Sequence, residues 1–300
     1  MPSAYLLVSH GSKDRRPELS MQQLAALVCH EKPNNIFQGV IDNPVNAACG
    51  DSRIISPPKS VNIVGTACLE LGVEPLHKQI ENFAYRLAKE GFYKFGLDNL
   101  GLDNSALNAL KILPIFLSPG VHVMEDIPSE VALAQQNLDS NTNIKISLLP
   151  YLGTHPGLTQ LLAKKLLATQ VASQVLPTWI LLAHGSRRPG GNQPVEYIAD
   201  SLGAIAAYWS TPPNLQSLVK ELVDKGWKEI GIQPYFLFSG GITDKIARTT
   251  EELKFQFPGV NLYLNDPLGP GIDLAKIIWD LTEMNCQDTK EVIANPVAYE

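Results

Sequence analysis

The chain has 300 residues, of which 45% are hydrophobic and 18% charged, and its formal net charge is -6 at pH 7. So mild a balance gives the surface no general attraction for nucleic acid or for an anionic membrane. No apolar run approaches the roughly 18 residues of a membrane span, and the N-terminus lacks the basic stretch and apolar core of a signal peptide. We therefore expect a cytoplasmic protein without nucleic-acid or membrane partners.

The cysteines exclude several kinds of site. Cys29, Cys49, Cys68 and Cys286 contain no CxxC pair and lie far apart in the chain. This spacing argues against a zinc ribbon, a cysteine-ligated cluster and the disulfide framework of a secreted protein. We expect most of them to be small buried side chains.

The first predicted element is a short apolar strand, Leu6 to Val8, which stops at His10 and turns through Gly-Ser into a charged segment. A helical pattern follows from Pro17. A continuous apolar run bounded by a turn is typical of a strand buried on both faces of a parallel sheet. A similar sequence pattern occurs twice: residues 4–17 read AYLLVSHGSKDRRP and residues 179–189 read WILLAHGSRRP. The chain is therefore interpreted as a duplicated unit.

Three more strands, each followed by a helix, are predicted in the first half. The strands are Val61–Leu71, Ile112–Leu117 and Ile144–Leu149, and the helices begin at Pro75, at Met124 and near Leu158. Residues 31–60 and 91–110 have no sustained period and are interpreted as loop insertions. Strands that alternate with helices four times predict a four-stranded parallel α/β sheet with helices on both faces.

The second half repeats this order with shorter connections. Strands are predicted at Ile180–Ala183, Glu229–Phe236 and Val260–Leu264, and helices at Leu215–Leu222, Ile242–Phe255 and Leu274–Leu281. A second strand has only a weak candidate, Ala204–Trp209. The junction falls at Val171–Pro177, which predicts one domain at residues 1–172 and another at 173–300.

Three side chains at predicted strand ends suggest a metal site in the first half. His10, Glu70 and His122 each follow a strand, and the carboxyl ends of parallel strands meet at one edge of a sheet, where ligands bind. Two imidazoles and a carboxylate suit a borderline divalent metal such as ferrous iron, cobalt or nickel. Three protein ligands also leave coordination positions open for a substrate.

The second copy retains only the first of these residues. His184 keeps its Gly-Ser turn, but Ile242 occupies the position of His122, and the counterpart of Glu70 is expected near Tyr208 or Trp209. Residues needed for folding would be expected in both copies. The asymmetry therefore favours a single active site in the N-terminal half.

These segments together resemble the sirohydrochlorin chelatases, the class II tetrapyrrole chelatases that insert ferrous iron or cobalt into the macrocycle. The resemblance rests on HGS with a following Arg-Pro, CLEL with a downstream proline, PIFLSPGVHVMEDIP and LGTHPGL, and it extends over nearly the whole chain outside the insertions and the tail. It implies two chelatase-like domains related by a pseudo-twofold axis, with a cleft between them. The second domain would carry a degenerate site.

The resemblance also implies roles for individual residues. His10 and His122 would handle the metal ion and accept pyrrole protons, and Glu70 would assist metal binding or proton removal. Sirohydrochlorin is a polycarboxylate, so the crevice needs cationic and hydrogen-bonding groups. The candidate substrate-binding residues are Ser9, Ser12, Lys13, Arg15, Arg16, Ser118 and His155, and Arg187 and Arg188 repeat the cationic turn beside His184.

The predicted function is that of a lyase that inserts ferrous iron into sirohydrochlorin to make siroheme. The metal ion and the macrocycle are substrates, and no separate cofactor is required. Cobalt insertion for cobalamin synthesis remains an alternative, because the same ligands accept both ions. A noncatalytic metal or tetrapyrrole carrier is a second alternative. A hydrolase is disfavoured, because serines beside His10 do not form a GxSxG nucleophile elbow. The internal duplication predicts a monomer.

Overall fold

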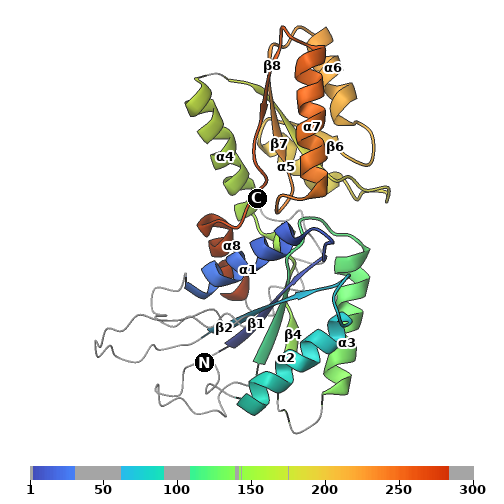
Figure 1. The fold of residues 1–300 in the computed structure, drawn as a ribbon, viewed down its shortest axis with the longest axis vertical. Coiled ribbons are helices and arrows are strands. Elements are labelled where there is room, and N and C mark those ends of the chain that lie inside the picture. The colour runs from blue at the N-terminus through green and yellow to red at the C-terminus, as the bar shows by residue number, and fades with distance from the viewer. Residues whose placement is uncertain are drawn as a thin grey trace, which may run out of the picture.

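The computed structural model describes residues 3–30, 62–90, 109–138, 142, 144–174 and 176–283. These residues form two α/β lobes, one above the other in Figure 1. Each lobe is built on a four-stranded sheet whose neighbouring strands are all parallel, with the orders β2-β1-β3-β4 and β6-β5-β7-β8. The predicted fold class, α/β with two such sheets, is confirmed.

The first half supplies the first sheet and its connections. Its strands are β1 (Ser3–Ser9), β2 (Asn62–Cys68), β3 (Ala109–Pro114) and β4 (Lys145–Leu148). Its helical segments are α1 (Arg15–His30), α2 (Leu76–Glu90), the π-helical turn η3 (His122–Asp126), α3 (Ile127–Asn137), the 3-10 turn η4 (Leu152–Thr154) and α4 (Gly157–Ser173).

The second half repeats the pattern. Its strands are β5 (Thr178–Ala183), β6 (Ile205–Tyr208), β7 (Glu229–Pro234) and β8 (Asn261–Leu264). Its helices are α5 (Gln193–Ser201), α6 (Leu215–Asp224), α7 (Gly241–Gln256) and α8 (Ile272–Glu283). The weak strand candidate at residues 204–209 is confirmed as β6, whereas α5 was not predicted.

The continuous apolar sequence of β1 follows from burial on both faces of its sheet. Tyr5 and Leu7 belong to one hydrophobic cluster, and Leu6 and Val8 belong to another on the opposite face. Successive strand residues point to opposite faces, so a strand covered on both sides has no polar alternation. β1 is also central, because it pairs with both β2 and β3.

One predicted strand is displaced. The third strand was expected at residues 112–117, but β3 spans 109–114 and its pairing with β1 ends where Pro114 faces Val8. Ile115 is nevertheless 1% exposed. Ile115 is apolar because it packs in the core just beyond the end of the strand. Sequence periodicity alone cannot distinguish such a residue from one inside a strand. The predicted insertion 31–60 and nearly all of 91–110 lie outside the described residues.

The last helix of each half packs against the lobe of the other half. Figure 1 shows α4 beside the second sheet and α8 beside α1 in the first lobe. In α8, the ring of Trp279 meets the ring of Tyr5 edge-on at 5.7 Å between centroids, and the carbonyl of Thr282 accepts from Lys111 Nζ at 3.0 Å. In α4, Thr169 donates to Asn265 of the second lobe at 2.7 Å.

This exchange joins the two halves through a shared core. One hydrophobic cluster contains side chains from β1, α1, α4, β5, α5 and α8, whereas two further clusters each stay within one lobe. Each packed lobe therefore contains one helix from the other half of the sequence. The division at residues 172 and 173 describes the sequence repeat and stays a prediction.

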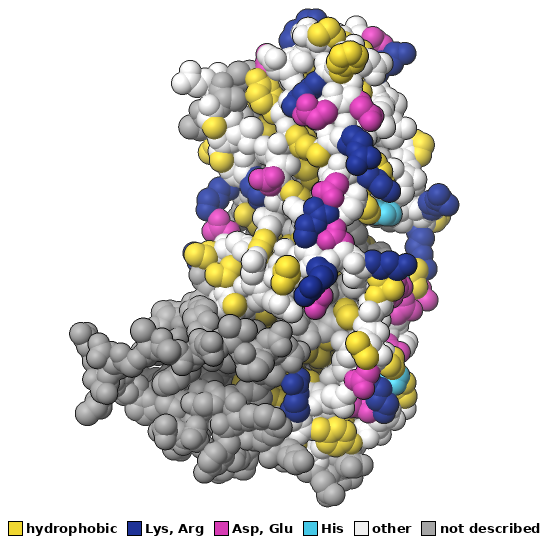
Figure 2. Space-filling view, in the orientation of Figure 1, with side chains coloured by type: hydrophobic (Ala, Val, Ile, Leu, Met, Phe, Trp, Pro, Cys, Tyr) yellow, Lys and Arg dark blue, Asp and Glu magenta, His cyan; other side chains and the backbone are white. Residues whose placement is uncertain are grey.

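The surface matches the mild net charge. On the face in Figure 2, basic and acidic side chains are interspersed over both lobes and are not separated by sign. Among the described helices, none combines the length and the apolarity required to cross a bilayer.

Candidate metal centre

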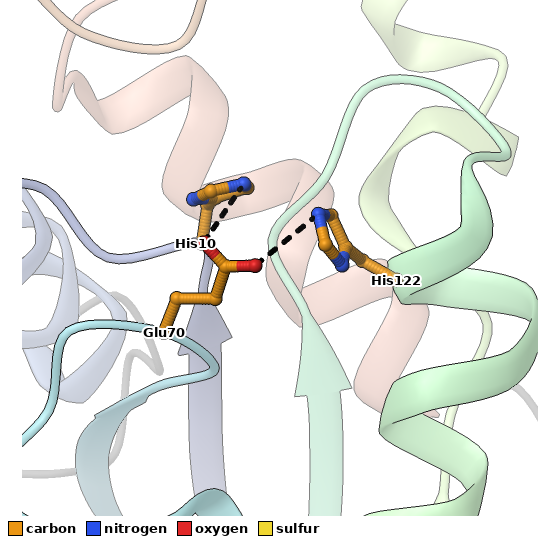
Figure 3. Close-up of side chains that lie close together, drawn as sticks. All are labelled: His10, Glu70 and His122. Atoms are coloured by element: carbon orange, nitrogen blue, oxygen red, sulfur yellow. Dashed lines mark ion pairs between the residues drawn. The ribbon is translucent and has the colours of Figure 1, made fainter.

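His10, Glu70 and His122 converge at one edge of the first sheet. His10 follows β1, Glu70 follows β2, and His122 opens the turn η3 that comes after β3 (Figure 3). His10 Nε2 lies 3.9 Å from Glu70 Oε2, and His122 Nε2 lies 3.8 Å from Glu70 Oε1. One potential ligand atom from each of the three lies within 4.8 Å of the others. Within the described part of the chain, no other His, Cys, Asp or Glu residues form such a group of three.

The site is open to a large substrate. The side chains of His10 and Glu70 are 52% and 49% exposed, and that of His122 is 33% exposed. A metal ion held by three protein atoms at this position would keep coordination positions free on its solvent side. The residues therefore suit transfer of an ion to another ligand better than permanent storage in a closed cage.

The backbone fixes two of the three side chains beside each other. The N–H of Glu70 donates to the carbonyl of His10 at 2.9 Å. Gly11, at φ +96°, makes this approach possible, because a Cβ atom there would lie 1.9 Å from the carbonyl oxygen of Glu70. The glycine of the HGS turn is thus required on both conformational and steric grounds.

The hydrogen bonds of both histidines leave Nε2 free for a metal ion. His10 Nδ1 lies 3.2 Å from the carbonyl of Gly11, and His122 Nδ1 lies 2.8 Å from a carboxylate oxygen of Asp126. Carbonyl and carboxylate oxygens only accept, so these partners assign the proton to Nδ1 in each ring. The lone pair of each Nε2 is then available on the side that faces Glu70. Asp126 was predicted only as part of a helix and not as part of this site.

The second lobe has no equivalent ligand set. The N–H of Ser210 donates to the carbonyl of His184 at 2.9 Å, as Glu70 does to His10, so Ser210 is the counterpart of Glu70. The expected counterpart, Tyr208 or Trp209, was wrong by one or two positions, because strand register is set by backbone pairing that the sequence does not show. A neutral hydroxyl replaces the carboxylate, and Ile242 replaces His122.

The cations of the two HGS turns divide into paired and unpaired groups. Arg16 forms ion pairs with Asp14 and, across the lobes, with Asp244, and it holds the pKa of Asp14 down to about 2. Its hydrogen bond likewise lowers the pKa of Asp244. Arg188 Nη2 lies 3.4 Å from Glu125 Oε1 of the first lobe. By contrast, the remaining cations of these turns are exposed and have no ion-pair partner among the described residues: Lys13, Arg15 and Arg187.

The serine candidates are held mainly by local structure. Ser12 accepts a hydrogen bond from the N–H of Asp14 at 3.0 Å, which closes the turn before α1. The hydroxyl of Ser9 lies 3.5 Å from the carbonyl of Ala67, at the limit of a hydrogen bond. Ser118 is half-buried in the segment between β3 and η3. Ser9 and Ser118 therefore flank the strand ends that carry the metal candidates.

His155 lies apart from the three converging residues. Its Nδ1 accepts from the N–H of Gly157 at 3.1 Å, and its Nε2 lies 4.0 Å from a carboxylate oxygen of Asp280 in α8. Burial lowers the pKa of His155, and the charge of Asp280 partly opposes this shift. Its observed partners belong to the packing of α4 and α8.

The sequence and the fold are both similar to those of known proteins. The sequence model of the CbiX family matches residues 96–169 and 178–284. The solved structure of SirB from Bacillus subtilis with Fe3+ is 20% identical with a TM-score of 0.62, and the alignment covers 98% of this chain and 97% of that one. No curated protein sequence matches the chain.

Two further solved structures are similar to this chain over nearly its full length. The sirohydrochlorin chelatase SirB from Bacillus subtilis subspecies spizizenii in complex with cobalt is 20% identical with a TM-score of 0.59, over 99% of this chain and 97% of that one. CbiX, described as the terminal enzyme for biosynthesis of siroheme in denitrifying bacteria, is 18% identical with a TM-score of 0.57, over 94% and 100%. At these identities the likeness shows that the fold is shared.

Proposed function

This chain belongs to the CbiX family of class II chelatases, and from that membership we propose that it inserts ferrous iron into sirohydrochlorin to make siroheme. The observation that carries the proposal is the convergence of His10, Glu70 and His122 at an exposed sheet edge. Nothing comparable is formed by His184, Ser210 and Ile242 in the second lobe. The proposed reaction therefore takes place on the first lobe.

The three side chains supply the donors that the incoming ion needs. The Nε2 atoms of His10 and His122 and one oxygen of Glu70 would bind the ion, and the carboxylate would offset part of its charge. Imidazole and carboxylate together suit a borderline ion such as Fe2+ or Co2+. The open coordination positions would receive the pyrrole nitrogens, so that protein ligands are exchanged for macrocycle ligands.

Insertion also requires removal of two protons. As each metal–nitrogen bond forms to a protonated pyrrole nitrogen, the corresponding N–H bond breaks and its proton must reach a base. The dication replaces two protons, so the charge of the macrocycle core does not change. His10, His122 and Glu70 can each accept a proton once they release the metal, because the nitrogen or oxygen atom that held the ion then has a free lone pair.

The unpaired cations would bind the carboxylates of the macrocycle. Lys13 and Arg15 follow the HGS turn of the first lobe, and Arg187 occupies the same turn of the second. Arg16 was expected to contribute, but its guanidinium is engaged by Asp14 and Asp244. We therefore assign substrate recognition to the unpaired cations, with Ser9, Ser12, Ser118 and His155 as further candidates.

Cobalt insertion is the second candidate reaction. SirB structures exist with Fe3+ and with cobalt, so relatives with this fold bind either element. A set of two imidazoles and one carboxylate does not discriminate strongly between the two divalent ions. Iron and cobalt insertion should therefore be measured side by side, under anaerobic conditions that keep iron ferrous.

A multiple-turnover assay tests the proposal. Purified protein would be mixed with an excess of sirohydrochlorin and of Fe2+ or Co2+, and the absorbance of the macrocycle followed against a protein-free control. We expect many product molecules per protein molecule, faster than in the control. Product that stops at one equivalent, or a rate equal to the control, would instead identify a carrier and contradict the proposed enzyme.

A further inference from the structure

We propose that Asp126 is a positioning residue for the metal centre, because its carboxylate fixes His122 in the tautomer whose Nε2 lone pair faces Glu70. The inference rests on the proposed function to the extent that His122 is a metal ligand. It adds a residue outside the three potential ligands. Its role is to orient a ligand, not to contact the ion or the macrocycle.

The side chain of Asp126 is committed to the histidine. Asp126 lies where η3 continues into α3, with helical backbone angles of φ -69° and ψ -52°, and its carboxylate makes no hydrogen bond to a backbone N–H there. Instead Oδ2 lies 2.8 Å from His122 Nδ1. Among the described residues, the hydrogen bond of this carboxylate is therefore made to the imidazole.

The two candidate histidines are oriented by different partners. His10 Nδ1 donates to the neutral carbonyl of Gly11 at 3.2 Å, within the same turn. His122 Nδ1 donates to a charged acceptor at the shorter distance of 2.8 Å. A charge-assisted bond is stronger, and a carboxylate behind a metal-bound imidazole also raises its donor strength. Without Asp126, no described partner would prevent the proton from moving to Nε2, where it would block ligation.

The local backbone is built around this pair. His122 and Asp126 are the first and last residues of the π-helical turn η3, whereas the equivalent segment of the second lobe is the start of the regular helix α7. Met124 N–H donates to the carbonyl of Gly120 as Asp244 N–H donates to that of Gly240, which fixes the equivalence. π-helical turns often mark functional sites.

The second lobe has lost both members of the pair together. At the start of this segment Ile242 takes the place of His122. The π-helical turn then adds one residue, so the fully buried Ile127 of the first lobe matches Ile246, and Lys245 takes the place of Asp126. Ile246 is fully buried. A carboxylate that served only the start of the helix would have no reason to disappear along with the histidine. Joint loss is expected if the carboxylate acts through the imidazole.

The same protein contains a matched control pair. His77 Nδ1 lies 2.8 Å from Glu130 Oε2, and Glu130 also accepts from the backbone N–H of His77. This pair links the start of α2 to α3 and belongs to no potential metal group among the described residues. Loss of the Glu130 charge should therefore weaken packing without changing the affinity for metal.

The test combines tautomer and affinity measurements on the whole protein. Two-bond 1H–15N NMR on metal-free protein at about pH 8, where imidazoles are neutral, should show the His122 proton on Nδ1. Asp126→Asn and Asp126→Ala should move it to Nε2 in a substantial fraction of molecules. Titration with Co2+ alone, followed by visible absorbance, should show affinity reduced about 10- to 100-fold in both variants. Glu130→Gln should bind Co2+ as the wild type does.

The outcomes separate this inference from the proposed function. Wild-type Co2+ affinity and an unchanged tautomer in both Asp126 variants would overturn the positioning role and leave the chelatase proposal intact. An affinity loss in Glu130→Gln equal to that in Asp126→Asn would also overturn it, because the effect would then reflect general packing. If the wild type bound no Co2+ and inserted no metal, the metal centre itself would fail.

Discussion

Arg16 in the first lobe forms a bidentate ion pair with Asp244 in the second, with Nη1 2.9 Å from Oδ1 and Nη2 2.6 Å from Oδ2. Arg188 makes the reciprocal contact with Glu125, at 3.4 Å. Each pair joins the HGS turn of one lobe to the first helical turn after the third strand of the other. The two cationic turns therefore connect the lobes to each other.

Replacement of Arg15, which has no ion-pair partner among the described residues, should impair substrate binding more than replacement of Arg16, which is paired with Asp14 and Asp244. Arg15→Ala removes a cation that is free to meet a carboxylate, so we expect KM for sirohydrochlorin to rise about tenfold, the scale of one charge-assisted hydrogen bond. Arg16→Ala removes a guanidinium that is already engaged and should raise KM less. Steady-state kinetics at fixed ionic strength measures both. An equal or larger rise in Arg16→Ala would show that substrate displaces Asp244 from Arg16.

Acid should weaken the ion pair between Asp14 and Arg16 in the first lobe. Because Arg16 holds the pKa of Asp14 near 2 in the folded protein, against about 3.9 in an unfolded chain, the ionised carboxylate stabilises the fold above pH 4. This contribution is lost as the pH falls toward 2. Urea unfolding at a series of pH values should give a shallower decline over this interval for Asp14→Asn than for the wild type. Identical slopes would argue that the pair does not persist in solution.

His155 should add a second pH dependence, at higher pH. Burial lowers its pKa in the folded state, so the unfolded chain binds the proton more readily. The stability that depends on neutral His155 is therefore complete above about pH 6.5 and is lost as the pH falls below that value. Between pH 7 and 5, the free energy of unfolding should fall more steeply in the wild type than in His155→Gln. A steeper fall in the variant would reverse the sign and contradict the observed environment.

The exchanged helix α8 should be essential for stability of the first lobe. Trp279 is 6% exposed and packs edge-on against Tyr5, so Trp279→Ala should lower the free energy of unfolding by about 3–5 kcal/mol. Phe255→Ala is the control, because Phe255 is 91% exposed and its loss should change stability by less than about 0.5 kcal/mol. Urea denaturation measures both. A Trp279→Ala effect as small as that of Phe255→Ala would show that α8 does not hold this position in solution.

Much of the fold could be predicted, because the relevant signals are local. The apolar run before His10 predicted a strand buried on both faces, and the repeat of HGS predicted two similar units. The convergence of His10, Glu70 and His122 followed from one topological rule, that parallel strands end at the same edge. None of these steps required knowledge of which helix covers which sheet.

The features that could not be predicted depend on long-range geometry. Periodicity shows that α4 and α8 each have an apolar surface, but not that each covers the other lobe. Likewise, the partner of Arg16 lies in a distant part of the sequence, at Asp244. One feature of the sequence could have indicated the role of Asp126. It lies four residues after His122, and this spacing places two side chains on one face of a helix. The same spacing also suited an ordinary first-turn carboxylate.

The most direct test compares three single histidine variants in anaerobic metal insertion. With sirohydrochlorin and Fe2+ or Co2+ in excess, His10→Ala and His122→Ala should each reduce the rate to the protein-free level, with unchanged far-UV circular dichroism. His184→Ala should keep most of the wild-type rate, because its lobe lacks the other two ligands. A rate in His184→Ala as low as that in His10→Ala would contradict a metal centre confined to the first lobe.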